Sequence, residues 1–403
     1  MCVIAIIGAG ASGMLAAATA AENPENQIIL FERQARPGRK LLATGNGRCN
    51  LTNRGCAPAH YHSETPGFAD AALADFPPEE TLAWFLSRGL LTVTEPSGRV
   101  YPLSNAANSV LDVLRFSLRR PNITLRAGEA VTAVRRGDGG FSVETGTGTV
   151  AADRVIVACG GAAGAKLGGV RDGYALLQGL GHTRTALHPA LVQLTTDPEY
   201  PRALKGVRAD ARLTLSAPRQ VLARAEGEVQ FTEKGVSGPA AFDLSRAAAT
   251  GGEKLELTLD FLRDYAARDV LALLTARRET APELPAEELF TGMVHNRVGK
   301  MILRYVNFTT TRSLRDVSDA ELKAAARASK NFTLRVRGTE GFESAQVTAG
   351  GIRASEFDAR TLESRIVPGL FACGEVLDVD GDCGGYNLQW AWSSGRKAGR
   401  LGK

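Results

Sequence analysis

Three glycines near the start of the chain, Gly8, Gly10 and Gly13, have G-x-G-x-x-G spacing in the segment GAGASG. In this pattern the first glycine permits a tight turn, the second lets the backbone approach a pyrophosphate, and the third allows close helix–strand packing. Glu32 follows about 20 residues later, where a carboxylate can accept hydrogen bonds from an adenosine ribose. The spacing predicts a dinucleotide site, whose remaining local members are Ala11, Ser12 and Arg33.

A second glycine–acid turn, Gly374–Glu375, lies near the other end of the chain in PGLFACGEVLD. An NAD dehydrogenase does not need such a turn, whereas the longer FAD needs contacts at both of its ends. The following CGGYNLQ is expected to begin a helix whose free N–H groups face the flavin N1–C2=O edge. We therefore predict FAD as the cofactor and add Gly160, Asn387 and Leu388 to its site.

The segment from Arg39 to Asn53 is expected to form a loop that crosses the flavin. Its cations would neutralise the pyrophosphate and its amides would bond the flavin edges. The cations are Arg39, Lys40 and Arg48, and the amides are those of Asn46 and Asn50. Val131 either reads adenine through its backbone or is a core valine of a strand. Both interpretations stand.

The elements that position these residues follow from hydrophobic patterning. Residues 3–7 and 27–32 read as buried parallel strands around a helix at 12–22, and residues 155–159 as another buried strand. From Pro189 the pattern becomes that of an antiparallel, half-exposed sheet, and residues 263–330 have helical spacing. The chain closes with a strand near residue 370 and a helix.

These patterns predict an α/β fold built on a discontinuous, two-dinucleotide-fold Rossmann-type FAD domain. That domain is expected to comprise residues 1–188 and 350–403. An inserted β-rich domain would comprise residues 189–262 and 331–349, and a helical subdomain residues 263–330. The insertion is expected to decide the substrate.

Composition narrows the function classes. The net charge of +5 is spread along the chain, so no nucleic-acid partner is expected from it. Six cysteines without a CxxC pair disfavour a disulfide scaffold or a zinc site and fit a reducing cytoplasm. The uncharged run Val3–Ala21 is long enough for a membrane span, but its glycines break it, so no membrane association is expected. The oligomeric state is left open.

Few side chains offer direct chemistry. Cys49 and Cys56 lack the spacing of a redox dithiol, so Cys49 is only a weak catalytic candidate. His188, beside Pro189, is another weak candidate as acid or base, with a structural role as its alternative. His60 and His62 are expected in a loop without acidic or thiol partners at ligand spacing, so no metal is predicted.

A bacterial family of FAD-dependent oxidoreductases, labelled BaiN-like or aminoacetone-oxidase-like, resembles this chain over nearly its whole length. The resemblance is carried by GRKLLATGNGRCNLTN (38–53), FTEKGVSGPA (231–240), VTAGGI (347–352) and GLFACGEVLDVDGDCGGYNLQWAWSSG (369–395). It is weakest near residues 263–330. It implies an FAD domain interrupted by a β-rich insertion that carries helices. Bile-acid enone reduction and aminoketone oxidation are both attached to members, so the resemblance does not name the substrate.

We therefore expect an FAD-dependent oxidoreductase that transfers a hydride to or from a small organic substrate. NAD(P)H is the expected reductant and a candidate transient co-substrate, although no second G-x-G-x-x-G is present to hold it. An amine or aminoketone oxidase that produces hydrogen peroxide is one alternative. A flavin-dependent RNA-modifying or RNA-binding protein is the alternative from another class.

Overall fold

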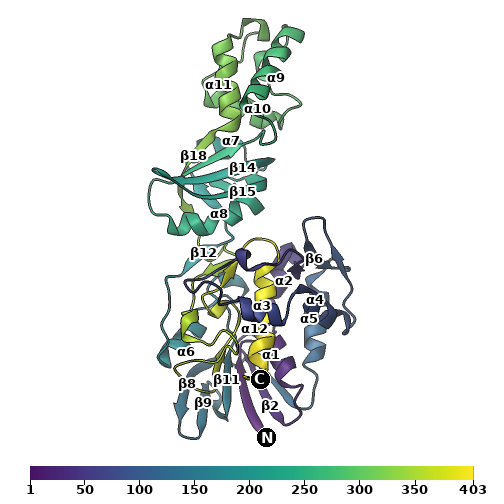
Figure 1. The fold of residues 1–403 in the computed structure, drawn as a ribbon, viewed down its shortest axis with the longest axis vertical. Coiled ribbons are helices and arrows are strands. Elements are labelled where there is room, and N and C mark those ends of the chain that lie inside the picture. Colours follow the sequence, from purple (N-terminus) through teal and green to yellow (C-terminus); the bar gives the residue numbers. More distant parts are fainter. Residues whose placement is uncertain (403) are drawn as a thin grey trace. The chain divides into compact units, whose positions relative to one another are not determined.

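The computed structural model describes residues 1–402, which divide into two compact units (Figure 1). Unit 1 comprises Met1–His188 and the chain from Ala345 onward, and unit 2 comprises Pro189–Ser344. The chain thus leaves unit 1 and later returns to it. This confirms the predicted fold class, a discontinuous Rossmann-type domain with a β-rich insertion and helices. The finer bounds given above for the three domains stay predictions.

Unit 1 is built on a parallel sheet with the strand order β20-β11-β1-β2-β7. In a parallel sheet the carboxyl ends of all strands meet at one edge, which is where such folds bind ligands. The C-terminal strand β20 therefore presents its end beside the ends of β11 and β1. The five strands are β1 (Cys2–Ile7), β2 (Asn26–Glu32), β7 (Ile123–Ala127), β11 (Arg154–Val157) and β20 (Leu370–Ala372).

The uncharged N-terminal run divides into β1 and the helix α1 (Ala11–Ala20). The alanine-rich α1 is buried on all sides, as expected of a helix that is apolar all round. The run therefore belongs to the core of unit 1. In the described part of the chain, residues 1–402, no helix has the length and apolar character that a membrane span requires.

The C-terminal helix α12 (Tyr386–Gly399) packs directly on α1, and two of its glycines make the close approach possible (Figure 1). A Cβ atom on Gly395 would lie 2.4 Å from the Ser12 carbonyl oxygen, and one on Gly399 would lie 2.6 Å from that of Ala16. Only glycine fits at these positions. The last helix is thus seated on the helix of the glycine fingerprint.

Further elements of unit 1 surround this sheet, and those between residues 54 and 118 were not anticipated. The expected loop from Arg39 begins instead with the short helix α2 (Arg39–Ala43), which Gly38 starts with a φ of 76°. The remaining helices are α3 (Asp70–Asp75), α4 (Pro78–Leu86), α5 (Ala107–Ser117) and α6 (Asp172–Gly179). The small sheets contain β3 (Thr52–Asn53), β4 (Tyr61–His62), β5 (Thr92–Thr94), β6 (Arg99–Pro102), β8 (Val131–Gly137), β9 (Gly140–Thr145), β10 (Gly148–Ala152), β19 (Val347–Ala349) and β21 (Asp380–Gly381).

Unit 2 contains a closed antiparallel barrel with the order β13-β16-β15-β14-β17-β18, where an antiparallel, half-exposed sheet was expected without its closure. The expected alternation is present, since Ala211, Leu213 and Leu215 are buried while the residues between them are not. Closure removes the sheet edges, which a local pattern does not reveal. The strands are β13 (Leu194–Thr196), β14 (Arg208–Ala217), β15 (Gln220–Phe231), β16 (Gly235–Ser237), β17 (Glu256–Asp260) and β18 (Phe332–Thr339), and β12 (His188–Ala190) precedes them.

The helices of unit 2 share one hydrophobic core with its barrel. Phe231 and Leu257 of the barrel belong to the same buried cluster as Leu274 and Ile302 of the helices. The capping box of Ser318 and Glu321 starts α11, because each side chain accepts from the other's backbone N–H. The helices are α7 (Glu199–Ala203), α8 (Pro239–Thr250), α9 (Ala267–Thr280), α10 (Asn296–Tyr305) and α11 (Asp319–Lys330).

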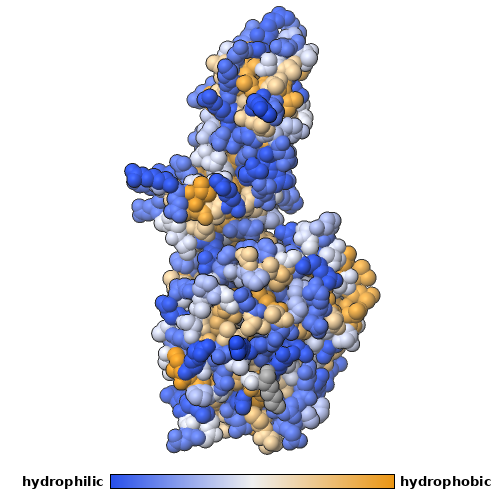
Figure 2. Space-filling view, in the orientation of Figure 1, coloured by the Kyte–Doolittle hydropathy of each residue, from blue (hydrophilic) through white to orange (hydrophobic). Residues whose placement is uncertain are grey.

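The surface is mainly hydrophilic, with a few apolar areas (Figure 2). One such area on the face shown covers the β6 side of unit 1. Exposed apolar side chains of that region include Leu91, Val93 and Leu103, which lie on or beside the β5–β6 hairpin. Apolar atoms are common on protein surfaces, so these residues assign no partner by themselves.

Candidate functional site

The predicted glycine turns meet at the carboxyl edge of the parallel sheet. Gly8 follows β1. A Cβ atom added to it would lie 2.5 Å from the carbonyl oxygen of Ala158, which follows β11. Gly374 follows β20, and a Cβ atom added to it would lie 2.6 Å from the Ser12 hydroxyl oxygen. The two turns, far apart in sequence, are therefore neighbours in unit 1.

The turn Gly8–Gly13 is closed toward the protein and open in front. A Cβ atom on Gly13 would lie 1.8 Å from the Gly8 carbonyl oxygen, so helix and turn touch there. By contrast, apart from the adjoining chain, no described residue lies within 4 Å of a Cβ atom built on Gly10. Gly10 caps α1, whose first N–H groups face a negatively charged ligand favourably. This open cradle fits the pyrophosphate of a dinucleotide.

Glu32 is fixed at the end of β2 by two backbone donors. Its carboxylate accepts from the Ala9 N–H at 3.1 Å and from the Gln34 N–H at 2.8 Å. A carboxylate has about four acceptor positions, so it keeps capacity for ribose hydroxyls. Ala9 lies in the glycine turn, so Glu32 is held beside the cradle.

Glu375 and Lys40 form an ion pair that joins α2 to the turn after β20. Lys40 Nζ lies 2.8 Å from Glu375 Oε2, and the side chains are 31% and 19% exposed. The other carboxylate oxygen accepts from the Thr348 N–H at 2.7 Å. Lys40 was expected to neutralise a pyrophosphate. The structure gives its charge a protein partner at the same edge.

Asn50 supplies an orphaned polar atom, because its Oδ1 is buried and has no hydrogen-bond partner among the described residues. A Cβ atom on Gly385, which has a φ of 102° and caps α12, would lie 2.9 Å from that oxygen. A buried acceptor left unpaired is costly, so this oxygen is available to a ligand donor. The flavin N3–H is a donor of the required kind, so this end of the site fits FAD.

A buried network holds Asn50 against α12. Gln389 accepts from the Thr52 hydroxyl at 2.6 Å and donates to the Phe76 carbonyl oxygen at 2.8 Å. Trp392 Nε1 donates to the Leu51 carbonyl oxygen at 2.9 Å. The motif GRCNLTN and the motif GGYNLQWAWSSG therefore position each other. Gln389 and Trp392 were not singled out from the sequence.

Two other residues predicted to bind the cofactor, Arg48 and Arg33, form ion pairs with protein carboxylates. Arg48 pairs with Glu95 at 2.9 Å and covers the Tyr101 ring at 4.0 Å. Arg33 pairs with Asp172 at 2.9 Å. Their positive charge is thus shared with protein groups. Arg39 and Asn46 are exposed, and Ala11 begins α1.

The remaining predicted positions are Val131, Gly160, Asn387 and Leu388. Val131 starts β8 and is buried, which agrees with both interpretations of it. Gly160 has a φ of 73° and open space where a Cβ would be. Asn387 uses its amide to hold Gly381, accepting from its N–H at 2.8 Å and donating to its carbonyl oxygen at 2.7 Å. Leu388 follows it in the first turn of α12.

Cys49 is fully buried, and burial raises the pKa of its thiol to about 12. It is therefore protonated at neutral pH and is neither a nucleophile nor an attacking thiol. Cys56 is also a free thiol, and burial raises its pKa as well.

We expect the double variant Cys49→Ala, Cys56→Ala to reduce its flavin within about threefold of the wild-type rate, because neither thiol is activated. Stopped-flow absorbance measures this, and iodoacetamide labelling followed by mass spectrometry should leave Cys49 unmodified in the native protein. A hundredfold slower reduction, with loss of a thiolate-to-flavin charge-transfer band, would contradict it and favour a disulfide reductase.

His188 begins β12 and is half-buried. It adjoins the boundary between the two units, so the structure assigns it no place beside the glycine turns. Its catalytic role stays a weak prediction.

His60 and His62 were expected to lack an acidic partner, and this expectation is wrong. His60 lies just before β4 and His62 within it, and the two share one carboxylate. Asp382 lies 2.9 Å from His60 Nδ1 and 2.7 Å from His62 Nε2. This partner was missed because it is remote in sequence. The only local signal was that it adjoins the CGGYNLQ motif. Among residues 1–402, no group of three or more His, Cys, Asp or Glu side chains is placed to hold a metal ion.

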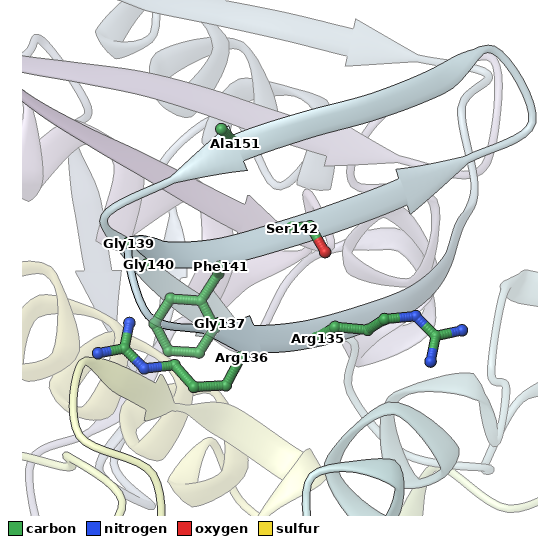
Figure 3. Close-up of a pocket in the computed structure, with 8 residues that line it drawn as sticks. All are labelled: Arg135, Arg136, Gly137, Gly139, Gly140, Phe141, Ser142 and Ala151. Carbon is green, nitrogen blue, oxygen red and sulfur yellow. The ribbon is translucent and has the colours of Figure 1, made fainter.

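A hollow of about 310 Å³ lies on the β8–β9 hairpin of unit 1 (Figure 3). Arg136 lies over the Phe141 ring at 4.7 Å, and Arg135 pairs with Glu144 at 2.6 Å. Gly137, Gly139, Gly140 and Ser142 of the hairpin and Ala151 of β10 also line it. The hollow contains none of the residues predicted to bind the dinucleotide, so it is separate from that predicted site.

Comparisons with known proteins show which proteins this chain is similar to. The family model described as HI0933-like protein Rossmann domain matches residues 2–401. The chain is 40% identical over 401 residues to a Clostridium scindens protein named 3-dehydro-bile acid delta(4,6)-reductase, with 98% of each chain covered. It is 30% identical over 392 residues to an Escherichia coli K12 protein named ribosomal RNA dihydrouridine synthase, with 96% of this chain and 95% of the relative covered. A solved flavocytochrome c3 fumarate reductase structure has 17% identity and a TM-score of 0.48, covering 100% of this chain and 78% of that one.

Proposed function

We propose that this chain, which belongs to the HI0933-like family and is an FAD-dependent oxidoreductase, reduces a carbon–carbon double bond conjugated to a carbonyl group. The observation that carries the proposal is the 40% identity, over 98% of each chain, to a protein named as a reductase of a 3-dehydro-bile acid. A 3-oxo group conjugated to ring double bonds is an enone. The proposed substrate class is therefore an apolar cyclic enone.

The second relative supports the same reaction type on a different molecule. Dihydrouridine is uridine with its C5–C6 double bond reduced, and that bond is conjugated to a carbonyl group. The names of these two relatives thus imply different substrates but the same reaction, reduction of a double bond conjugated to a carbonyl group. Because a fold hosts many substrates, the shared bond type is a firmer inference than either substrate.

The residues that would hold FAD lie at the carboxyl edge of the sheet in unit 1. The backbone of Gly8–Gly13 would bind the pyrophosphate, Glu32 the adenosine ribose, and Asn50 the flavin ring. FAD, when bound, supplies the hydride for the double bond. The protein then has to bind and orient the enone and deliver a proton to it.

NAD(P)H is the proposed reductant. The sequence has one G-x-G-x-x-G segment, and the structure uses it at the end of β1. A nicotinamide would therefore dock against the flavin without a second dinucleotide fold.

Reduction of an RNA base is the second candidate, favoured by the 30% identity to the ribosomal RNA enzyme. It is weaker because the identity is lower and because many basic residues of unit 2 are paired with acids. Nucleic-acid binding faces present unpaired, clustered Lys and Arg. The pairs include Arg208–Glu228, Arg212–Glu226, Arg263–Asp210, Lys234–Glu340 and Arg337–Asp197.

Anaerobic stopped-flow mixing tests the proposal. We expect NADH or NADPH to bleach the flavin of the holoenzyme, and a 3-oxo-Δ4 bile acid to restore its absorbance, because the enone accepts the electrons. Saturated 3-oxo bile acid is the matched control and should leave the flavin reduced. If aminoacetone bleaches the flavin and NAD(P)H does not, the chain is an amine oxidase and the proposal fails.

A further inference from the structure

The pairing of β4 with β21 brings two histidines onto one carboxylate. Asp380 pairs with His62 and Gly381 with Tyr61, and the Asp382 N–H donates to the His60 carbonyl oxygen at 3.0 Å. This register places Asp382 between the imidazoles, 2.9 Å from His60 Nδ1 and 2.7 Å from His62 Nε2. The cluster lies entirely within unit 1.

Contacts with α12 fix the orientation of His60. Its ring stacks on Tyr386, the first residue of α12, with centroids 4.2 Å apart and an angle of 16° between the planes. Tyr61 donates its hydroxyl to the Tyr386 carbonyl oxygen at 3.1 Å. Asn387 ties Gly381 to the same turn of the helix. The imidazole is thus held by its carboxylate partner and by an aromatic face.

The cluster borders the flavin end of the proposed cofactor site. Gly385, whose added Cβ would lie 2.9 Å from the orphaned Asn50 oxygen, directly precedes Tyr386. Asn53 Nδ2 donates to the Gly384 carbonyl oxygen at 2.9 Å, which fixes the turn against the segment that carries Asn50. The turn from Gly381 to Gly385 therefore joins the cluster to Asn50, which would accept from the flavin in the proposed site.

The charges of the cluster suit proton delivery. Burial raises the pKa of the Asp382 carboxyl group, but the hydrogen bonds and charges of His62 and His60 outweigh it and lower that pKa overall. Asp382 thus accepts hydrogen bonds as a carboxylate. The side chains of His60 and Asp382 are 36% and 31% exposed, so water can resupply a proton. Burial raises the pKa of Tyr61, which makes that phenol a poor acid here.

We propose that His60, oriented by Asp382, donates the proton that completes reduction of the conjugated double bond; this rests on the proposed function. Asp382 accepts from Nδ1–H, and Nε2 is the atom that delivers the proton. As the hydride supplied through FAD adds to the β-carbon, the His60 Nε2–H bond breaks and a C–H bond forms at the α-carbon. NAD(P)H supplies the electron pair, the imidazole becomes neutral, and water returns its proton. Asp382 is a positioning residue.

His62 is the less suitable donor of the two. It bonds Asp382 through Nε2, its distal nitrogen, whereas His60 bonds it through Nδ1 and has Nε2 at the far side of the ring. His60 also contacts α12. Two titratable groups contact His60: Asp382 bonds its Nδ1, and Tyr386 stacks on its ring. His62 shares Asp382, and Tyr61 contacts Tyr386.

Anaerobic re-oxidation of the reduced holoenzyme by a 3-oxo-Δ4 bile acid tests this role. We expect His60→Gln to slow re-oxidation about 100-fold, within the range for loss of a general acid. Reduction by NAD(P)H and FAD content should stay within about twofold. Added imidazole should raise the re-oxidation rate of the His60→Ala variant at least about tenfold.

Two further variants separate a chemical role from a structural one. The Asp382→Asn variant should lose the His60 Nδ1–H signal in NMR spectra of histidine-labelled protein. The chain has five histidines, so few signals need assignment. His182→Gln is the matched control, because His182 also pairs with a carboxylate, Glu356, at 2.8 Å. It should lower the melting temperature and leave re-oxidation unchanged.

The outcomes distinguish the inference from the proposed function. Equal re-oxidation by wild type and His60→Gln overturns the role of His60 and leaves the proposed function standing. Slow re-oxidation without imidazole rescue, together with reduced FAD content, shows a structural role and also overturns the inference. Wild-type holoenzyme that does not react with the enone overturns the proposed function and, with it, the inference.

Discussion

The Gly10→Val variant will fold normally and fail to bind FAD. Apart from the chain next to it, nothing among residues 1–402 lies within 4 Å of a Cβ atom on Gly10, and its φ of −81° is open to any residue. A valine side chain would instead fill the space in front of the turn, where the pyrophosphate would approach. We expect FAD affinity to fall at least about 100-fold, which corresponds to about 2.7 kcal/mol. Flavin absorbance of the purified protein and titration of the apoprotein with FAD measure the loss.

Gly139→Val is the matched control for this variant. Gly139 is also a glycine with open space and no left-handed backbone conformation, but it lies on the β8–β9 hairpin. It should bind FAD as the wild type does. Full FAD occupancy in Gly10→Val would show that the cofactor does not lie against this turn, and would remove the basis for the dinucleotide site.

The Gly395→Ala variant should lose about 3 kcal/mol of unfolding free energy, the upper part of the range for an overpacked core. Its added methyl group would lie 2.4 Å from the Ser12 carbonyl oxygen, so α12 would have to move away from α1. Ser12 also touches the Gly374 turn, so FAD affinity should fall as well. Denaturant unfolding of the apoprotein measures the first effect, and FAD titration the second.

Gly179→Ala provides the comparison within unit 1. Gly179 is the last residue of α6 and has nothing within 4 Å of an added Cβ. In a helix, alanine is more favourable than glycine by about 1 kcal/mol at most, so this variant should not be destabilised. If both variants unfold like the wild type, the two helices are not in close contact, and the C-terminal helix does not depend on the glycine fingerprint.

The parts of the fold that follow from local pattern were accessible from the sequence. The strand–turn–helix around Gly8–Gly13 combines a buried β-branched run with glycines at functional spacing, so local sequence was enough. The return of the chain to the first sheet was predicted from the Gly374–Glu375 turn. The helix at the C-terminus, confirmed as α12, followed from the CGGYNLQ start and the length of the pattern.

The parts that depend on contacts between distant segments were not accessible. Asp382 meets His60 only because β21 pairs with β4, and two-residue strands leave almost no periodicity to detect. Arg48 has the positive charge needed to bind an anion, but it forms an ion pair with Glu95 instead. Barrel closure in unit 2 depends on the pairing of β13 with β18, which alternation along a single strand does not encode.

Product analysis in an anaerobic mixture of holoenzyme, NAD(P)H and a 3-oxo-Δ4 bile acid tests the proposed reaction most directly. The account predicts a product heavier by two hydrogen atoms that keeps its 3-oxo group, with one nicotinamide oxidised for each double bond reduced. In deuterated water the α-carbon should acquire one solvent deuterium. Recovery of unchanged enone after the flavin has been fully reduced, or reduction of the 3-oxo group to an alcohol with the double bond intact, would contradict it.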